Sequence, residues 1–157
     1  MVLKLEMALN CSLLEAGIYY GRNTWALPDG RHTGDPLGNT IGPRTGSDKN
    51  GLTAMLSSVA RMPLKLGVGD SGCNVLIPKD MLKTEEMRGK IAALVKTFML
   101  MGGQLAQITT ATLEDMKDAK IHPEDHDGLI VRVGGFSKRF VECDEIVQDE
   151  LISRYAE

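Results

Sequence analysis

The chain has 157 residues, 43% of them hydrophobic, which is typical of one globular domain with its own core. A net charge of −3 without a basic cluster predicts no nucleic-acid partner, and no apolar run is long enough to predict a membrane span. Three cysteines without paired spacing predict reduced thiols in a cytoplasmic protein: Cys11, Cys73 and Cys143.

Residues 1–20 are expected to form an N-terminal lead-in to a single domain over 21–157. Charged residues interrupt the apolar stretch at the start, which argues against a signal peptide. Residues 2–16 suit either a short helix or an irregular segment. Ile18-Tyr19-Tyr20 predicts a strand that ends at Gly21.

The segment 21–51 is predicted to be a long loop. Glycines recur at every fourth position from Gly30 to Gly46 with prolines between them, which excludes a helix or a central strand. A phosphate-binding loop would need a Lys-Ser/Thr pair after its last glycine, and this segment has none. The remaining interpretation is an ordered loop that lies against a partner surface.

Beyond this loop, helices and strands alternate, which predicts an α/β architecture. Strands are expected at 73–77, 104–109 and 129–133, and Phe140-Val141 is expected to continue extended. Helices are expected at 52–61, 84–101 and 112–120 and after Asp144. The expected N-caps are Asp48 or Asn50, Thr84, Thr112 and Asp144, Gly102-Gly103 ends the second helix, and the last helix turns Ile146, Val147, Leu151 and Tyr155 inward.

The polar run from His122 to Asp127 has the spacing of two histidines on one helix face, which would suit a metal ion. Pro123 and the surrounding polar residues instead predict a turn, so no metal site is expected there.

The stretch from Arg132 to Phe136 follows a buried strand and contains two adjacent glycines. The local pattern predicts a tight turn. The run Arg132-Val133-Gly134-Gly135-Phe136 also resembles the glycyl radical signature Arg-Val-x-Gly-Tyr/Phe, with Gly135 at the radical position. A radical at an α-carbon is shared with the neighbouring amide nitrogen and carbonyl, which requires a planar carbon. Glycine has no Cβ to crowd the planar form, so both interpretations explain the residue.

Further segments resemble glycyl radical enzymes in the same order along the chain. They are Thr24 to Arg31, Gly34-Asp35-Pro36-Leu37, Ser47 to Gly51, Gly102-Gly103-Gln104 and His122-Pro123-Glu124. The family includes pyruvate formate-lyase and several dehydratases and decarboxylases. The resemblance implies the C-terminal part of a ten-stranded α/β barrel, with a Gly-rich long loop, a radical glycine loop and a C-terminal helix.

By the same resemblance, an activating enzyme with S-adenosylmethionine and an iron–sulfur cluster would install the radical on Gly135. The radical would then pass to a cysteine on a larger partner chain, which acts on a small-molecule substrate that this sequence does not specify. None of the three cysteines here matches that position, so all three are expected to be structural thiols. The resemblance implies no bound cofactor and no metal.

Two main hypotheses remain open at this stage, beside a third in which the chain is an inactive relic, against which the intact radical motif argues. The chain is either a radical-bearing subunit or fragment of an anaerobic enzyme, or a non-catalytic spare-part protein that replaces an oxygen-cleaved C-terminus. Similarity that extends back to Pro28-Asp29-Gly30-Arg31 favours the first.

Overall fold

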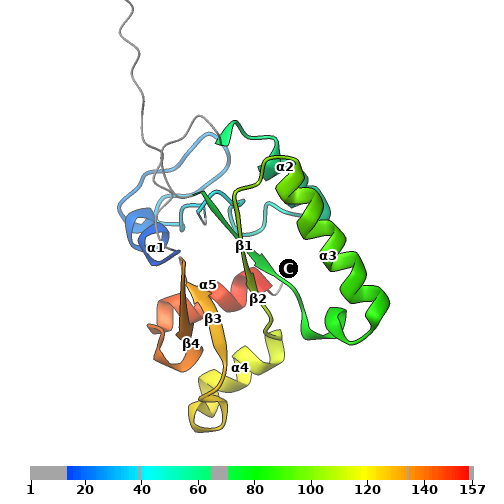
Figure 1. Cartoon of the computed structure of the whole chain (residues 1–157). Helices are drawn as coiled ribbons and strands as arrows, with labels where there is room; N and C mark the ends of the chain where they lie inside the picture. Colours follow the sequence, from blue (N-terminus) through cyan, green and yellow to red (C-terminus); the bar gives the residue numbers. More distant parts are fainter. Residues whose placement is uncertain (1–13, 39, 65–70, 134, 156–157) are drawn as a thin grey trace, which may run out of the picture.

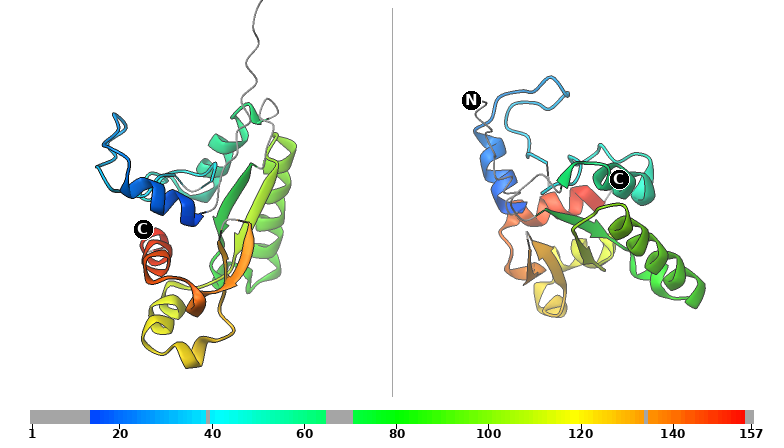
Figure 2. Two further views of the ribbon diagram at one scale, coloured as in Figure 1. Left: turned by 90° about the vertical axis from the view of Figure 1, so that its left-hand side faces the viewer. Right: turned by 45° about the horizontal axis from the view of Figure 1, so that its top comes forward.

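The computed structural model describes residues 14–38, 40–64, 71–133 and 135–155. These residues form a mixed α/β structure with two two-stranded sheets and helices on both sides of them, as Figures 1 and 2 show. Cys11, Gly134 and most of the segment 2–16 lie outside the described residues. Within the described part, no helix combines the length and hydropathy needed to cross a membrane.

The first element is a helix, α1 (Leu14–Arg22), so the predicted strand at Ile18-Tyr19-Tyr20 is wrong. Ile18 is buried, whereas Tyr19 and Tyr20 are exposed, and this is the one-sided burial of a helix end. Gly21 lies against the following loop so closely that a Cβ there would be 2.3 Å from the carbonyl oxygen of Asp35. Ile18, Tyr19 and Tyr20 all favour a strand by local propensity. The helix could not be predicted from them, because it depends on packing against a later segment of the chain.

The segment after α1 is the predicted long loop, without a regular helix or strand among its described residues between Arg22 and Gly51. Its first half is organised around Arg31, whose side chain is only 2% exposed. The guanidinium donates to the carbonyl oxygens of Gly21 (2.7 Å), Trp25 (2.8 Å), Thr24 (3.2 Å) and Asp35. Three of these acceptors lie in the loop and the fourth, Gly21, lies in the last turn of α1, so the loop carries its own anchor and fixes it to the helix that precedes it.

The first sheet pairs β1 (Gly72–Leu76) with β2 (Leu105–Thr109) in parallel, so that Gly72 lies opposite Leu105. The chain crosses between these strands through α3 (Glu85–Leu100), and α2 (Gly51–Ala60) packs beside α3. Buried residues of α2, β1, α3 and the adjoining connections form one hydrophobic cluster: Ile41, Leu56, Val59, Ala60, Leu64, Cys73, Val75, Ile77 and Phe98.

The predicted ends of α3 agree with the structure. Thr84 caps α3 by accepting the backbone N–H of Met87 at 3.2 Å, and Gly102 follows the helix with a positive φ of 113°. Asn50 precedes α2 as predicted, but its side chain makes no capping hydrogen bond.

The second sheet is the antiparallel hairpin of β3 (Ile130–Val133) and β4 (Phe136–Arg139). It packs with α4 (Leu113–Ile121) and α5 (Glu145–Tyr155), on the opposite side of the strands from α3 (Figure 2). The second hydrophobic cluster comprises Ile18, Ala111, Met116, Ala119, Leu129, Val131, Val133, Phe140, Cys143, Val147 and Leu151.

Two expectations for this C-terminal region are wrong. Phe140-Val141 is not extended but begins a short 3-10 helix, Phe140–Glu142, because Phe140 turns fully into the core. The extended partner of β3 is instead the polar run Phe136–Arg139, which lacks an apolar pattern. In α5, Val147 and Leu151 are buried as expected, but Ile146 is 36% exposed.

The segment around His122 forms a turn, as predicted, in a short 3-10 helix, Pro123–His126. Both histidines contact one carboxylate: His122 Nδ1 lies 3.2 Å from Asp118 Oδ1, and His126 Nε2 lies 2.7 Å from Asp118 Oδ2. Among the residues that the structure describes, no three His, Cys, Asp or Glu side chains are grouped to hold a metal ion.

Candidate functional site

The candidate site is the turn that joins β3 to β4. Val133 pairs with Phe136, so the loop between them consists of residues 134 and 135. Gly135 has a φ of +95°, a conformation that L side chains rarely adopt and that two-residue hairpin loops commonly require. The tight turn predicted for this stretch is therefore confirmed, and it requires a glycine at position 135 without any further chemistry.

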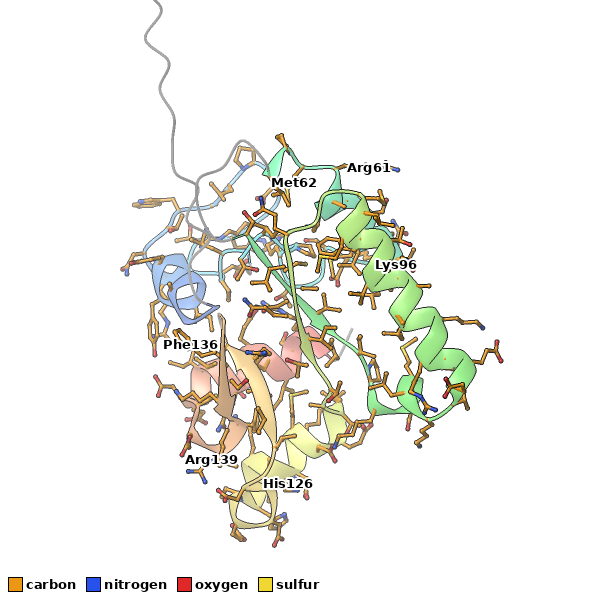
Figure 3. The ribbon with its side chains drawn as sticks, in the orientation of Figure 1. Arg61, Met62, Lys96, His126, Phe136 and Arg139 are labelled. Carbon is orange, nitrogen blue, oxygen red and sulfur yellow. The ribbon has the colours of Figure 1, made fainter. Side chains whose placement is uncertain are left out.

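The two strands of the hairpin differ in burial: β3 is largely buried near the tip, whereas β4 is largely exposed. Val131 is fully buried and Val133 is 4% exposed, whereas Phe136 is 68% exposed. Arg132, between the two valines, is half-buried. Figure 3 shows Phe136 at the free end of the hairpin and Arg139 at the opposite end. The buried valines fix the hairpin to the core, and its free end places the Gly135 backbone at the surface.

Two side chains of β2 bind the backbone of the hairpin. Gln107 Oε1 accepts the N–H of Gly135 at 2.8 Å, and Thr109 Oγ1 accepts the N–H of Arg132 at 3.1 Å. Both side chains are buried, at 6% and 4% exposure. Positions 107 and 109 share one face of the strand, so β2 presents two acceptors to the edge of β3.

These two residues were not predicted as part of the site. Gln107 and Thr109 alternate in a strand that was identified correctly, and buried polar side chains in such a strand need hydrogen-bond partners. Their alternation was a usable signal. Which backbone groups they bind could not be read from the sequence, because residues 107 and 135 are far apart along the chain.

Charged groups hold the other end of the hairpin. Arg139 pairs with both Asp127 and Glu142. Asp118, on α4, accepts hydrogen bonds from His126 and His122, which lower the pKa of its carboxyl. Arg139 and the carboxylates it contacts are solvent-exposed, as is Asp118, so we assign these groups to the outer surface rather than to the chemistry of the turn.

The two cysteines in the described part lie in separate cores. Cys73 belongs to the cluster with α2 and α3, and burial raises the pKa of its thiol to about 11. Cys143 belongs to the cluster with α5 and contacts the carbonyl oxygen of Arg139. Both fill core space, in keeping with the structural role predicted for them.

The backbone at Gly135 therefore combines three properties. The nitrogen is fixed by a buried acceptor, the turn is exposed, and, among the described residues other than its chain neighbours, a Cβ at this residue would come within 4 Å of Gln107 Nε2 alone, at 3.7 Å. The α-carbon is accessible to another protein while its amide is held in place. This arrangement is compatible with chemistry at the α-carbon itself.

Comparisons with protein families, known proteins and solved structures all match this chain, including the hairpin, to glycyl radical proteins. Residues 37–141 match the family described as "Glycine radical". The chain is 33% identical over 144 residues to the "Probable dehydratase YbiW" of Escherichia coli (strain K12), covering 91% of this chain. It is 32% identical over 137 residues to the "Trans-4-hydroxy-L-proline dehydratase" of Clostridioides difficile, covering 87% of this chain.

A solved glycyl radical enzyme from Archaeoglobus fulgidus has the same fold in this region, with a TM-score of 0.86 and 32% identity over 94% of this chain. The chain corresponds to only 19% of that structure. It spans 18% and 17% of the two dehydratases.

Proposed function

Since this chain belongs to the glycine radical family, we propose that it is the radical-bearing C-terminal part of a dehydratase-type glycyl radical enzyme and stores the radical on Gly135. The observation that carries the proposal is the position of the family match, which includes the hairpin and its exposed, amide-anchored glycine. We assign the motif to Arg132, Val133, Gly134, Gly135 and Phe136. The radical domain is proposed to comprise residues 21–157, with Ile18 of α1 contributing to its core.

In this proposal, a radical S-adenosylmethionine activating enzyme with an iron–sulfur cluster removes one hydrogen atom from the α-carbon of Gly135. The exposed turn gives that enzyme access to the α-carbon. The unpaired electron is shared with the Gly135 amide nitrogen and carbonyl. The glycine then accepts a hydrogen atom from a cysteine thiol in the larger part of the enzyme, and the resulting thiyl acts on the substrate.

The larger part is proposed to supply the thiyl cysteine, the rest of a ten-stranded barrel and most of the substrate pocket. Exposed large apolar side chains support an extensive contact with further polypeptide: Tyr20 (65%), Trp25 (82%), Ile130 (57%) and, at the turn, Phe136 (68%). The names of the relatives point to dehydration of a small hydroxylated compound. Similarity over about nine-tenths of the chain supports an enzyme fragment over a spare-part protein.

The first experiment locates the radical. The chain is incubated anaerobically with the activating enzyme of its host, S-adenosylmethionine and dithionite, and the organic radical is measured by electron paramagnetic resonance. Gly135→Ala should abolish the signal, because the α-carbon then carries a methyl group at a positive φ. Gly134→Ala is the matched control and should keep at least part of it. The reverse pattern would move the assignment to the neighbouring glycine.

A second experiment uses oxygen. A carbon-centred radical adds dioxygen, and the resulting peroxyl species breaks the backbone at that residue. Air should therefore release a peptide beginning near Phe136 from activated protein and leave unactivated protein whole, as measured by mass spectrometry. Equal cleavage of both samples would indicate proteolysis at the exposed turn instead.

A further inference from the structure

We propose that Gln107 is a positioning residue for the radical glycine, acting through the hydrogen bond that its carboxamide accepts from the Gly135 N–H. This inference rests on the proposed function, because it concerns the stability of a radical on Gly135. It assigns a role to a side chain that lies 28 residues before the glycine in the sequence.

The geometry around Gln107 is that of a fixed acceptor. Its backbone belongs to the parallel ladder, opposite Asn74, and its side chain is 6% exposed. Oε1 lies 2.8 Å from the Gly135 nitrogen, which is a good hydrogen-bond distance. A long polar side chain is costly to bury, so its burial here indicates that both the strand and the hydrogen bond hold it in place.

The carboxamide occupies a slot between two glycines. A Cβ at Gly72, in the neighbouring strand, would lie 2.7 Å from Gln107 Nε2, which is too close for the side chain to keep its position. A Cβ at Gly135 would lie 3.7 Å from the same nitrogen. The missing side chain at Gly72 is what makes room for the carboxamide beside the hairpin.

The hydrogen bond acts on the atoms that share the unpaired electron. An acceptor on the N–H increases the electron density of the amide nitrogen, which donates into the half-filled orbital of the neighbouring α-carbon. It also restricts rotation of the peptide group. The radical does not take a hydrogen atom from the Gln107 carboxamide, because the N–H bonds of a carboxamide are stronger than the α-carbon–hydrogen bond of glycine. The residue can therefore lie beside the radical without quenching it.

Thr109 provides the matched comparison. It is also buried on β2, and it binds the same hairpin through the N–H of Arg132. A purely structural role for Gln107 predicts that each of Gln107→Leu and Thr109→Val affects stability and the amide that the side chain binds, and nothing more. A positioning role predicts in addition that Gln107→Leu, and not Thr109→Val, changes the properties of the Gly135 radical.

The first measurement uses the unactivated full chain and needs no radical. Amide hydrogen exchange, followed residue by residue by NMR, should be about tenfold faster at Gly135 in Gln107→Leu, since one hydrogen bond is lost. Thr109→Val should accelerate exchange at Arg132 and leave Gly135 unchanged. Unchanged exchange at Gly135 in a folded Gln107→Leu chain would overturn the inference.

The second measurement uses the activated chain, labelled with ¹⁵N at glycine. Gln107→Leu should change the nitrogen hyperfine coupling and shorten the anaerobic lifetime of the signal several-fold, whereas Thr109→Val should match the wild type in both. Gln107→Glu keeps an acceptor oxygen at the same reach and should restore the lifetime. If Gln107→Leu fails to fold, Gly72→Ala replaces it, because its Cβ displaces the carboxamide and should produce the same changes.

The outcomes separate the two proposals. A wild-type chain that gives no radical with an active activating enzyme contradicts the proposed function, while the exchange result still decides whether Gln107 holds Gly135. A wild-type radical whose coupling and lifetime are unaltered by Gln107→Leu or Gly72→Ala overturns the positioning role alone.

Discussion

The long loop after α1 and the β3–β4 hairpin are both glycine-containing segments held by buried polar side chains, but their anchors differ in origin. Arg31 belongs to the loop that it organises, and its four carbonyl acceptors lie within residues 21–35. The hairpin is held by Gln107 and Thr109, which belong to β2. Each of these side chains accepts one hydrogen bond from the backbone of the hairpin.

The two segments therefore differ in what their anchors maintain: the anchor of the loop maintains its conformation, whereas the anchors of the hairpin maintain its location on the protein. The loop keeps its shape through charge-assisted hydrogen bonds from its own Arg31 to its own carbonyl groups and to that of Gly21 at the end of α1, and such bonds are stronger than neutral ones. The hairpin keeps its shape through its own strand pairing, and its position depends on two buried valines and two neutral hydrogen bonds from β2. Breaking the two hydrogen bonds should therefore loosen the turn at Gly135 without unpairing β3 from β4.

The largest effect is expected for the self-anchored loop. Arg31→Met keeps an apolar stem but removes every donor, and should lower the free energy of unfolding by about 3 kcal/mol, because several carbonyl groups lose a charged partner. Arg31→Lys, with a point charge in place of the planar guanidinium, should lose less. Chemical denaturation measures both variants. A loss below that of Thr109→Val would show that the loop does not depend on this anchor.

The next effect concerns the contact between α1 and the loop. Gly21→Ala would place a methyl carbon 2.3 Å from the carbonyl oxygen of Asp35, so the backbone must shift, at a cost of about 2 kcal/mol. Gly89→Ala, in the exposed interior of α3, meets no atom within 4 Å and should stabilise the chain by up to about 1 kcal/mol. Thermal melting checks the packing of α1: the melting temperature should fall in Gly21→Ala and rise in Gly89→Ala. Stabilisation by Gly21→Ala would contradict it.

The sequence predicted well those features that depend on local chemistry. Thr84 and Thr112 were identified as N-caps, and each accepts the N–H three residues on, because a capping bond is made within one turn. The turn at Gly135 was likewise local. α1 was misassigned because its burial is decided by later segments of the chain, whereas β4 was missed because its residues are mostly polar and exposed, without an apolar alternation to reveal a strand.

The site divides in the same way. Arg132 to Phe136 could be found because the motif is contiguous. Gln107 was placed in the right strand, but its partner is across the sheet, and the sequence does not encode which backbone N–H a buried acceptor binds. The same limit applied to Arg31. It was noted as part of a segment that resembles glycyl radical enzymes, but its role as the buried anchor of the loop was not predicted.

For the hairpin, Thr109→Val should lower the free energy of unfolding by about 1 kcal/mol, because the N–H of Arg132 loses its acceptor while the side chain keeps its shape. Exchange protection should fall at Arg132 and persist at Phe140, whose N–H donates to the carbonyl of Leu129 within the hairpin region. Equal loss at both amides would mean that the hairpin opens as a whole and that its own pairing is not sufficient to keep its shape.

The smallest effect is a difference in pH dependence. The N–H of His32 donates to Asp35 Oδ2 at 2.9 Å, and this bond is the main reason that the pKa of the Asp35 carboxyl is lowered from 3.8. A carboxyl whose pKa is lower in the folded state contributes stability above its unfolded pKa and loses it as the pH falls through the folded value. The His32 amide should therefore lose exchange protection below about pH 4, after correction for intrinsic rates.

The Gly135 and Arg132 amides bind neutral acceptors, so their protection should stay constant over the same range. Asp35→Asn should remove the pH dependence at His32 and leave the hairpin unaffected. Parallel loss at all three amides would instead indicate global acid unfolding, and the contrast between a charge-anchored loop and a neutrally anchored hairpin would not hold.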